Sequence, residues 1–164
     1  MIRRVIATAA IATATLGVLA VPGHAASKPN PCKLLKTSEI SEQFGGATVS
    51  AGKKGISTAV STQCQFDVAA TGDQPDGEVD VRVMTTGAKV AYNGLKNNKA
   101  LGHVAVPEVS GALWADNTKA MSVLKGDTLI TVQPLFTSAN PLPIHQLDTR
   151  EQAIALIKLA QKRA

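Results

Sequence analysis

The stretch QCQFDVAATGDQPDGEVDVRV, residues 63–83, consists of two runs of alternating apolar and polar residues separated by a polar loop. The apolar positions of the two runs are Cys64, Phe66, Val68, Val79, Val81 and Val83. Strict alternation is typical of a β-strand that buries one face and exposes the other. The loop between the runs is rich in residues that form turns. The stretch therefore predicts a β-hairpin.

A second hairpin is predicted by KAMSVLKGDTLITVQP, residues 119–134, where two strand-like runs meet at Lys125-Gly126-Asp127. Gly126 can adopt the positive φ angle that this turn needs. HVAVPEV predicts a short strand that Pro107 ends, and GALWADN predicts another strand or a bend. Residues 47–61 have no periodicity, which favours a loop or a weak edge strand.

Helical spacing of apolar residues recurs in three segments. The first is residues 38–44, the second lies between Ala88 and Lys99, and the third follows Asp148, which forms an Asp-x-x-Glu capping pair with Glu151. The apolar faces of the last two helices are Ala88, Ala91, Tyr92 and Leu95, and Ala153, Leu156, Ile157 and Ala160. An extended linker carrying His145 is predicted from Pro134, Pro141 and Pro143. Because helices between antiparallel hairpins pack on a sheet, we predict a single α+β domain with a mostly antiparallel sheet and about three helices.

The N-terminus has the order of a secretory signal: two arginines, an uncharged apolar stretch, and small residues before an expected cleavage after Ala25. A retained transmembrane anchor is the alternative, which the Ala- and Thr-rich composition and the lack of a following basic cluster disfavour. We expect residues 1–25 to be a signal peptide, residues 26–31 a short linker and residues 32–164 the domain.

Cys32 and Cys64 are the only cysteines. A lipid-modified cysteine follows the apolar core of a signal directly, whereas Cys32 follows the polar segment Lys28-Pro29-Asn30-Pro31. We therefore expect a freely secreted protein. Since exported proteins meet an oxidising environment, the two cysteines predict a disulfide. Its loop of roughly 33 residues corresponds to about 3.5 to 4 kcal/mol of stability in the chain-entropy description.

Composition narrows the classes of function. Removing 25 of the 164 residues leaves 139, with 15 basic and 12 acidic side chains and a net charge of +3. This small charge, with only five aromatic residues, argues against a nucleic-acid-binding protein. Two cysteines without the close pair spacing of zinc ligands argue against a zinc site. No metal and no cofactor are expected.

Charged residues suggest two candidate surfaces. Acidic residues gather on the first hairpin, where a calcium site is one interpretation and a solvated turn is the favoured one. These residues are Asp67, Asp73, Asp76, Glu78 and Asp80. The second candidate is a basic patch that attracts anionic wall polymers or a membrane surface through a salt-screened contact. Its residues are Lys53, Lys54, Lys89, Lys96 and Lys99. The alternative is an ordinary solvent-exposed helix face, which is favoured. Trp114 is expected to pack in the core, and stacking on a ligand is the less favoured interpretation.

A hydrolase triad can be drawn from His103 or His145 with Asp116 or Asp148 and a serine. The sequence has no Gly-x-Ser-x-Gly elbow or similar setting for a nucleophile. We expect no catalytic residues. His103 is expected to face solvent at the end of a strand, and His145 to lie in the linker.

The predicted domain begins with Cys32, Leu34, Leu35, Glu39, Ile40 and Gly45, and continues with a strand that has Cys64 and an aromatic residue two positions on, the Lys-Gly-Asp hairpin, and an Ala-rich last helix. This combination resembles the actinobacterial domain-of-unknown-function family 3558, over the region from about Cys32 to Ala164. The resemblance implies a small exported protein or lipoprotein of the cell envelope and no particular reaction. Lys36 stands where this family usually has a capping Thr, so we expect Thr37 to cap the first helix.

The sequence therefore predicts a secreted, non-enzymatic domain of the envelope or extracellular space that binds an unidentified envelope ligand or exported protein. The alternative is a small secreted hydrolase, and a secreted inhibitor of another exported protein is a third hypothesis. The predicted binding surface lies between the acidic hairpin and the lysine-bearing helix. Its residues are Lys89, Lys96, Lys99, Asp73, Asp76 and Trp114.

Overall fold

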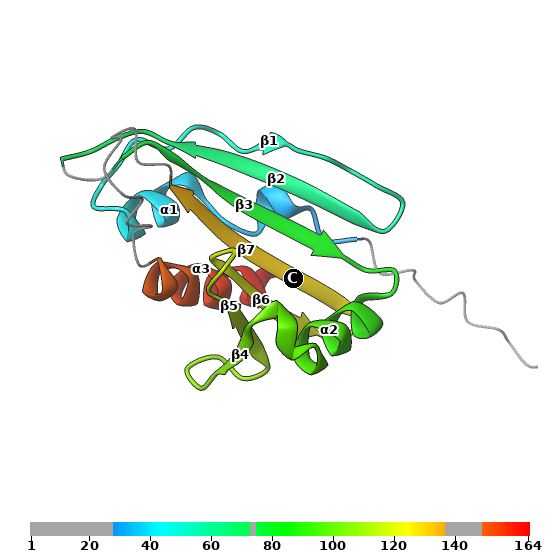
Figure 1. Cartoon of the computed structure of the whole chain (residues 1–164). Coiled ribbons are helices and arrows are strands. Elements are labelled where there is room, and N and C mark those ends of the chain that lie inside the picture. Colours follow the sequence, from blue (N-terminus) through cyan, green and yellow to red (C-terminus); the bar gives the residue numbers. More distant parts are fainter. Residues whose placement is uncertain (1–27, 73–74, 137–148) are drawn as a thin grey trace, which may run out of the picture.

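The computed structural model describes residues 28–72, 75–136 and 149–164. These residues form one α+β domain in which a seven-stranded antiparallel sheet carries three α-helices, as the sequence predicts (Figure 1). The helices are α1 (Thr37–Gln43), α2 (Ala88–Asn97) and α3 (Arg150–Arg163), and the short 3-10 helices are η1 (Pro31–Lys33) and η2 (Lys99–Leu101).

The strands lie in the spatial order β1-β2-β3-β7-β6-β5-β4, and all neighbours are antiparallel. They are β1 (Lys53–Lys54), β2 (Ser61–Val68), β3 (Gly77–Met84), β4 (His103–Val106), β5 (Ala112–Ala115), β6 (Ala120–Lys125) and β7 (Thr128–Phe136). Both predicted hairpins, β2–β3 and β6–β7, are present. Gly126 makes the second turn with a φ angle of 58°. Strands β1 to β3 and strands β4 to β7 form one sheet because β7 pairs with β3.

The sheet has an inner face, which η1, α1 and α3 cover, and an outer face, on which α2 lies. In Figure 1, α1 and α3 lie behind the strands and α2 lies in front of them. The alternation predicted for the first hairpin is confirmed, because Val81 lies opposite Cys64 and Val79 opposite Phe66, all in the core. The predicted apolar face of α3 is fully buried against this inner face, through Ala153, Leu156, Ile157 and Ala160.

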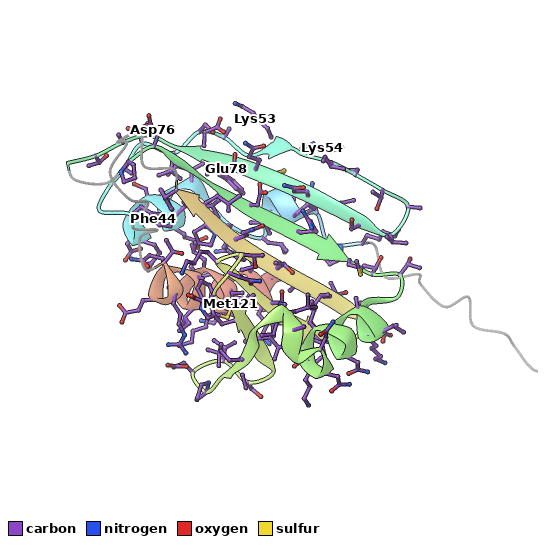
Figure 2. All side chains as sticks on the ribbon, in the orientation of Figure 1. Phe44, Lys53, Lys54, Asp76, Glu78 and Met121 are labelled. Carbon is purple, nitrogen blue, oxygen red and sulfur yellow. A yellow bond between two sulfur atoms is a disulfide. The ribbon has the colours of Figure 1, made fainter. Side chains whose placement is uncertain are left out.

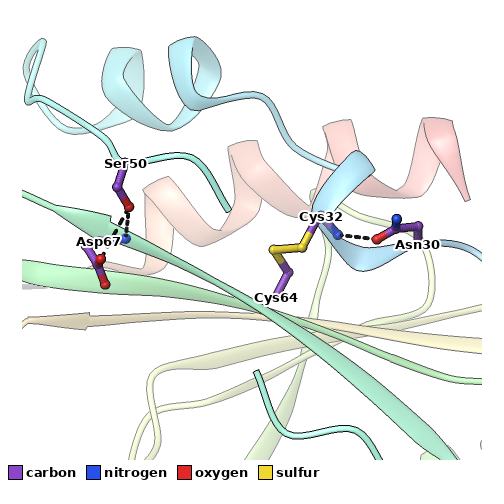
Figure 3. Close-up of a disulfide and its surroundings, with 5 residues drawn as sticks. All are labelled: Asn30, Cys32, Ser50, Cys64 and Asp67. Carbon is purple, nitrogen blue, oxygen red and sulfur yellow. Dashed lines mark hydrogen bonds between the residues drawn. A yellow bond between two sulfur atoms is a disulfide. The ribbon is translucent and has the colours of Figure 1, made fainter. Parts of the chain in front are cut away.

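The predicted disulfide is confirmed (Figure 3). Cys32 in η1 bonds to Cys64 in the middle of β2, with a distance of 5.1 Å between their Cα atoms. The backbone N–H of Cys32 donates to the side-chain oxygen of Asn30 over 3.0 Å, which fixes the start of η1. Because Cys64 is completely buried, the bond attaches the N-terminal segment to the inner face.

The cap of α1 differs from the prediction, since Lys36 and not Thr37 occupies the N-cap position. The backbone of Lys36 is already extended, and its N–H donates to the Glu39 carboxylate over 2.9 Å. This contact stabilises the helix end although the cap side chain is a lysine. Glu39 also forms an ion pair with Arg163, which joins the start of α1 to the end of α3.

Strand β7 continues past Pro134 to Phe136, beyond the predicted end of the strand. Its pairing with β6 stops at Val132, whereas its pairing with β3 continues and places Pro134 opposite Val79. A proline without an N–H is tolerated where a strand has a neighbour on one side only.

The last helix has Thr149 at its N-cap position. Asp148, which was expected to cap it, lies outside the described residues, as do Pro141, Pro143 and His145. The predicted signal peptide, residues 1–25, also lies outside them. Within the described part of the chain, no helix is both long and apolar enough to cross a membrane.

Candidate functional site

The outer face of the sheet has a part that α2 covers and a part that no described helix covers. Helix α2 packs over β4, β6 and β7. Leu129 of β7 and Leu113 of β5, which lies between β4 and β6, are buried. The remaining part, over β2, β3 and the last residues of β7, presents polar side chains at the positions that alternate with core residues. We call this set the outer polar face, and its residues are Gln63, Gln65, Asp67, Glu78, Asp80, Arg82 and Gln133.

The strand register brings these residues side by side. Opposite residues of neighbouring antiparallel strands have their Cβ atoms about 4.5 to 5.5 Å apart, so their side chains interact. The pairs are Gln63 with Arg82, Gln65 with Asp80, Asp67 with Glu78, and Asp80 with Gln133.

Asp80 lies in the middle of the outer polar face and is only 8% exposed. One of its oxygens, Oδ2, accepts a hydrogen bond of 2.5 Å from the side-chain amide of Gln63. The other oxygen, Oδ1, is buried and has no hydrogen-bond partner among the described residues. The sequence predicts that Asp80 faces outward, which is confirmed, and that it is solvated, which is wrong, because its side chain is largely buried among its neighbours.

Glu78 is the next residue on the same face of β3, and it accepts a hydrogen bond from the side-chain amide of Gln65. Partial burial raises the pKa of its carboxyl group, and the nearby carboxylates of Asp80 and Asp67 raise it further, against the opposing hydrogen bond from Gln65. Neither Glu78 nor Asp80 forms an ion pair with a described residue.

Asp67, by contrast, is neutralised by a partner. The ammonium group of Lys53 on β1 lies 2.6 Å from its Oδ2, and the Ser50 hydroxyl also contacts that oxygen (Figure 3). The hydrogen bond from Lys53 is the main cause that lowers the pKa of Asp67. Within the outer polar face, the carboxylates that form no ion pair with a described residue are therefore the two of β3.

Two open hollows adjoin the loop end of the outer polar face. One, of about 440 Å³, is lined by Asp76, Gly77, Glu78 and Leu135. The other, of about 360 Å³, lies along β2 and shares Asp76 and Gly77 with the first. In Figure 2, Asp76 and Glu78 lie at the end of the sheet away from α2. The hollows therefore add space beside an acidic part of the surface.

The described residues of the predicted surface do not all lie together. Lys89 and Lys96 are exposed on α2, whereas Asp76 is exposed at the opposite end of β3, in the loop before that strand. Trp114 is 3% exposed and belongs to the core, as expected. Asp73 and the side chain of Lys99 lie outside the described residues.

The surface between the hairpin loop and α2 is the outer polar face itself. Its residues could have been found from the sequence, since they are the polar members of the alternating runs QCQFDV and EVDVRV. The contribution of Gln133 could not, because nothing in the sequence indicates that β7 pairs with β3.

The lysines do not form one patch. Lys53 and Lys54 lie on the edge strand β1, whereas α2 contacts β4, β6 and β7. Lys53 is paired with Asp67, and Lys89 is paired with the exposed Asp127 over 2.6 Å. The favoured interpretation, of ordinary solvent-exposed side chains, agrees with this arrangement.

His103 differs from the prediction of a solvent-facing side chain. It is the first residue of β4 and is partly buried, and its Nδ1 atom has no partner among the described residues. This burial lowers the pKa of the imidazole. Three strands separate β4 from β3, so His103 is remote from the acidic residues of the outer polar face. His145 and its predicted role lie outside the described residues.

The described residues contain no group of three or more acidic, histidine or cysteine side chains arranged to hold a metal ion. Comparison with known proteins found no matching family model, no matching curated protein and no matching solved structure.

Proposed function

We propose that this protein is an exported, non-enzymatic binding domain of the cell envelope or extracellular space, and that it binds its partner through the outer polar face. The observation that carries this proposal is the buried Oδ1 of Asp80, an acceptor with no donor among the described residues, on a part of the sheet that α2 leaves uncovered. A bound ligand with an N–H or ammonium group would supply the absent donor.

The cost of this arrangement favours a functional role. A buried polar atom without a partner destabilises a folded protein by about 1 to 3 kcal/mol, and native structures contain few such atoms. Glu78 adds repulsion, because two carboxylates on the same strand face raise each other's energy when both are ionised. A positively charged ligand relieves both effects at once.

Export is supported by two observations of different kinds. The basic and apolar order of the first 25 residues is typical of a secretory signal. The disulfide between Cys32 and Cys64 is of a kind that persists in oxidising compartments. The resemblance to the envelope proteins of family 3558 agrees with both. We therefore place the binding function outside the cytoplasm.

Intact-mass measurement of the protein secreted by its own cells tests the export. We expect a chain that starts at Ala26 and is two hydrogens lighter than the reduced form. A diacylglycerol adduct or two alkylatable thiols would contradict the proposal.

A panel of ester, peptide and glycan substrates tests the non-enzymatic part. We expect no turnover by the purified exported protein. Turnover that is lost on replacing His103 or His145 would establish the hydrolase alternative instead.

Binding to an envelope fraction and to concentrated culture filtrate tests the assignment of the surface. We expect the wild-type protein and the Asp127→Asn control to bind alike, and Asp80→Asn to bind less. The control removes the same charge from an exposed turn that is remote from the outer polar face. Equal binding by all three proteins would show that the outer polar face is not the binding surface.

A further inference from the structure

The two carboxylates of the outer polar face that form no ion pair with a described residue, Glu78 and Asp80, lie two residues apart on the same strand. Glu78 and Asp80 are alternate residues of one strand and therefore project from the same face of β3. Alternate residues of a strand are about 6.6 to 6.8 Å apart. The face thus presents two negative charges at the repeat distance of an extended polypeptide.

We call Glu78 and Asp80 the acidic strip. Positively charged side chains lie on two sides of it. Lys53 on β1 forms an ion pair with Asp67, which lies opposite Glu78. Arg82, two residues beyond Asp80, is exposed and donates to the side-chain oxygen of Gln63 over 3.4 Å. A ligand with cations at other spacings would bring them near these like charges, so the position of the ligand is restricted as well as its charge.

Amide groups flank the strip and suit a polypeptide ligand. Gln65 and Gln133 lie on either side of Asp80 in the register. Gln65 donates to Glu78, and Gln133 donates to the backbone oxygen of Thr118 over 2.7 Å. Their amide oxygens accept no hydrogen bond from a described residue, and can accept from backbone or side-chain N–H groups of a ligand.

We infer that the ligand of the outer polar face is an extended polypeptide segment with Lys or Arg at alternate positions, lying along β3 so that successive basic side chains meet Glu78 and Asp80. This inference rests on the proposed function and specifies its ligand. A helix presents neighbouring side chains at positions three and four apart, so a basic helix does not reproduce this spacing with alternate residues.

Fluorescence anisotropy with labelled eight-residue peptides tests the inference. The peptides are alternating Lys-Ser, a block peptide of two Lys-Lys-Ser-Ser repeats that has the same charge but no two Lys at alternate positions, and alternating Glu-Ser. The exported protein is titrated at low ionic strength, because salt screens such contacts. We expect the alternating Lys-Ser peptide to bind about 3- to 10-fold more tightly than the block peptide, and alternating Glu-Ser not to bind, since each charge pair at an exposed surface contributes up to about fivefold.

Variants locate the contact. Glu78→Gln and Asp80→Asn should each weaken binding of the alternating peptide by about 2- to 5-fold, whereas Asp127→Asn should leave it unchanged. Near-ultraviolet circular dichroism and the melting temperature check that each variant is folded. Should Asp80→Asn be unstable, Glu78→Gln on the rim of the same strip decides the question.

The other outcomes separate the two proposals. Equal binding of the alternating and block peptides, or equal affinity for a free diamine, would overturn the extended-peptide inference. If no basic peptide binds but capture of envelope material still depends on Asp80, the inference fails and the proposed function stands. If neither peptide binding nor envelope binding depends on Glu78 or Asp80, both fail.

Discussion

The inner and outer faces of the sheet are built from the same strands but use their side chains differently. On β3, Val79 and Val81 are completely buried in a core completed by α3 and the disulfide. Between and beside them, Glu78 and Asp80 point the other way, accept hydrogen bonds from glutamines and have no cationic partner among the described residues. Stability is therefore concentrated on one face, so the opposite face can hold charges that do not stabilise the fold.

Removing the disulfide should give the largest change and affect only the inner face. In the double variant Cys32→Ala with Cys64→Ala, we expect a loss of about 3.5 to 4 kcal/mol in the free energy of unfolding, measured by urea denaturation. At temperatures where the variant is folded, ligand binding to the outer polar face should be retained. A loss below about 1 kcal/mol would contradict the assigned role of the bond.

The next largest effect is expected from the contact of α3 with the inner face. Leu156 is completely buried, so Leu156→Ala should cost about 3 kcal/mol through lost burial and the cavity it leaves. Val90→Ala is the control, because Val90 is an apolar helix residue on α2 that is 78% exposed. We expect its change to lie within about 0.5 kcal/mol, and a similar change for both variants would remove the distinction between the two sites.

The ion pair between Glu39 and Arg163 should contribute less. Glu39→Gln should cost about 1 kcal/mol, since the pair is partly exposed but charge-assisted and connects two helices. The hydrogen bond from Arg163 is the main cause that lowers the pKa of Glu39 in the folded state. The contribution is therefore present above the pKa of the unfolded chain and is lost as the pH falls through the folded value. Urea denaturation of both proteins at neutral and acidic pH should show the difference shrinking in acid.

A substitution on the outer polar face should have little effect on stability. Asp80→Asn removes a buried charge with an unsatisfied oxygen and also its repulsion of Glu78. We expect the free energy of unfolding to stay within about 1 kcal/mol of the wild-type value, or to rise. A loss as large as that of Leu156→Ala would mean that Asp80 holds the fold together and that the two faces do not differ in the way described.

The smallest effect is a pH dependence with a sign opposite to that of Glu39. The pKa of Glu78 is raised, first by burial and then by Asp80 and Asp67. Its contribution to stability is thus greatest below the unfolded pKa and is lost as the pH rises through the folded value. Binding of a basic peptide should weaken as the pH falls and Glu78 becomes protonated. Anisotropy titrations across this range should show a flatter profile for Glu78→Gln, and identical profiles would contradict the role of Glu78.

The inner face was predictable from the sequence because local patterns determine it. The alternation of Val79, Val81 and Val83 and the helical spacing around Leu156 are each visible within one segment. The disulfide joins two segments, but it could be predicted because the chain has only two cysteines. The hairpin turn at Gly126 belongs to the same class.

The outer polar face was only partly predictable because it depends on pairing between distant segments. Asp80 looks like a solvated strand residue in the sequence, and it becomes buried because β2 and β7 bring Gln65 and Gln133 to either side of it. The predicted strand ends at Pro134, whereas β7 continues to Phe136. The sequence does not show on which side β7 lacks a neighbour, so it does not show that a proline is tolerated there. Lys36 at the N-cap was missed because Glu39 satisfies its backbone N–H in place of a cap side chain.

The position of β7 between β3 and β6 also has a consequence for how the chain assembles. β3 ends at Met84 and β7 begins at Thr128, so a polypeptide that emerges N-terminus first exposes one edge of β3 until most of it has appeared. Both cysteines emerge before that and can be oxidised while the edge is still open. Pairings between distant segments form slowly, and an open strand edge is a template for pairing with other chains. The interval before β7 arrives is therefore when newly made molecules are most exposed to aggregation.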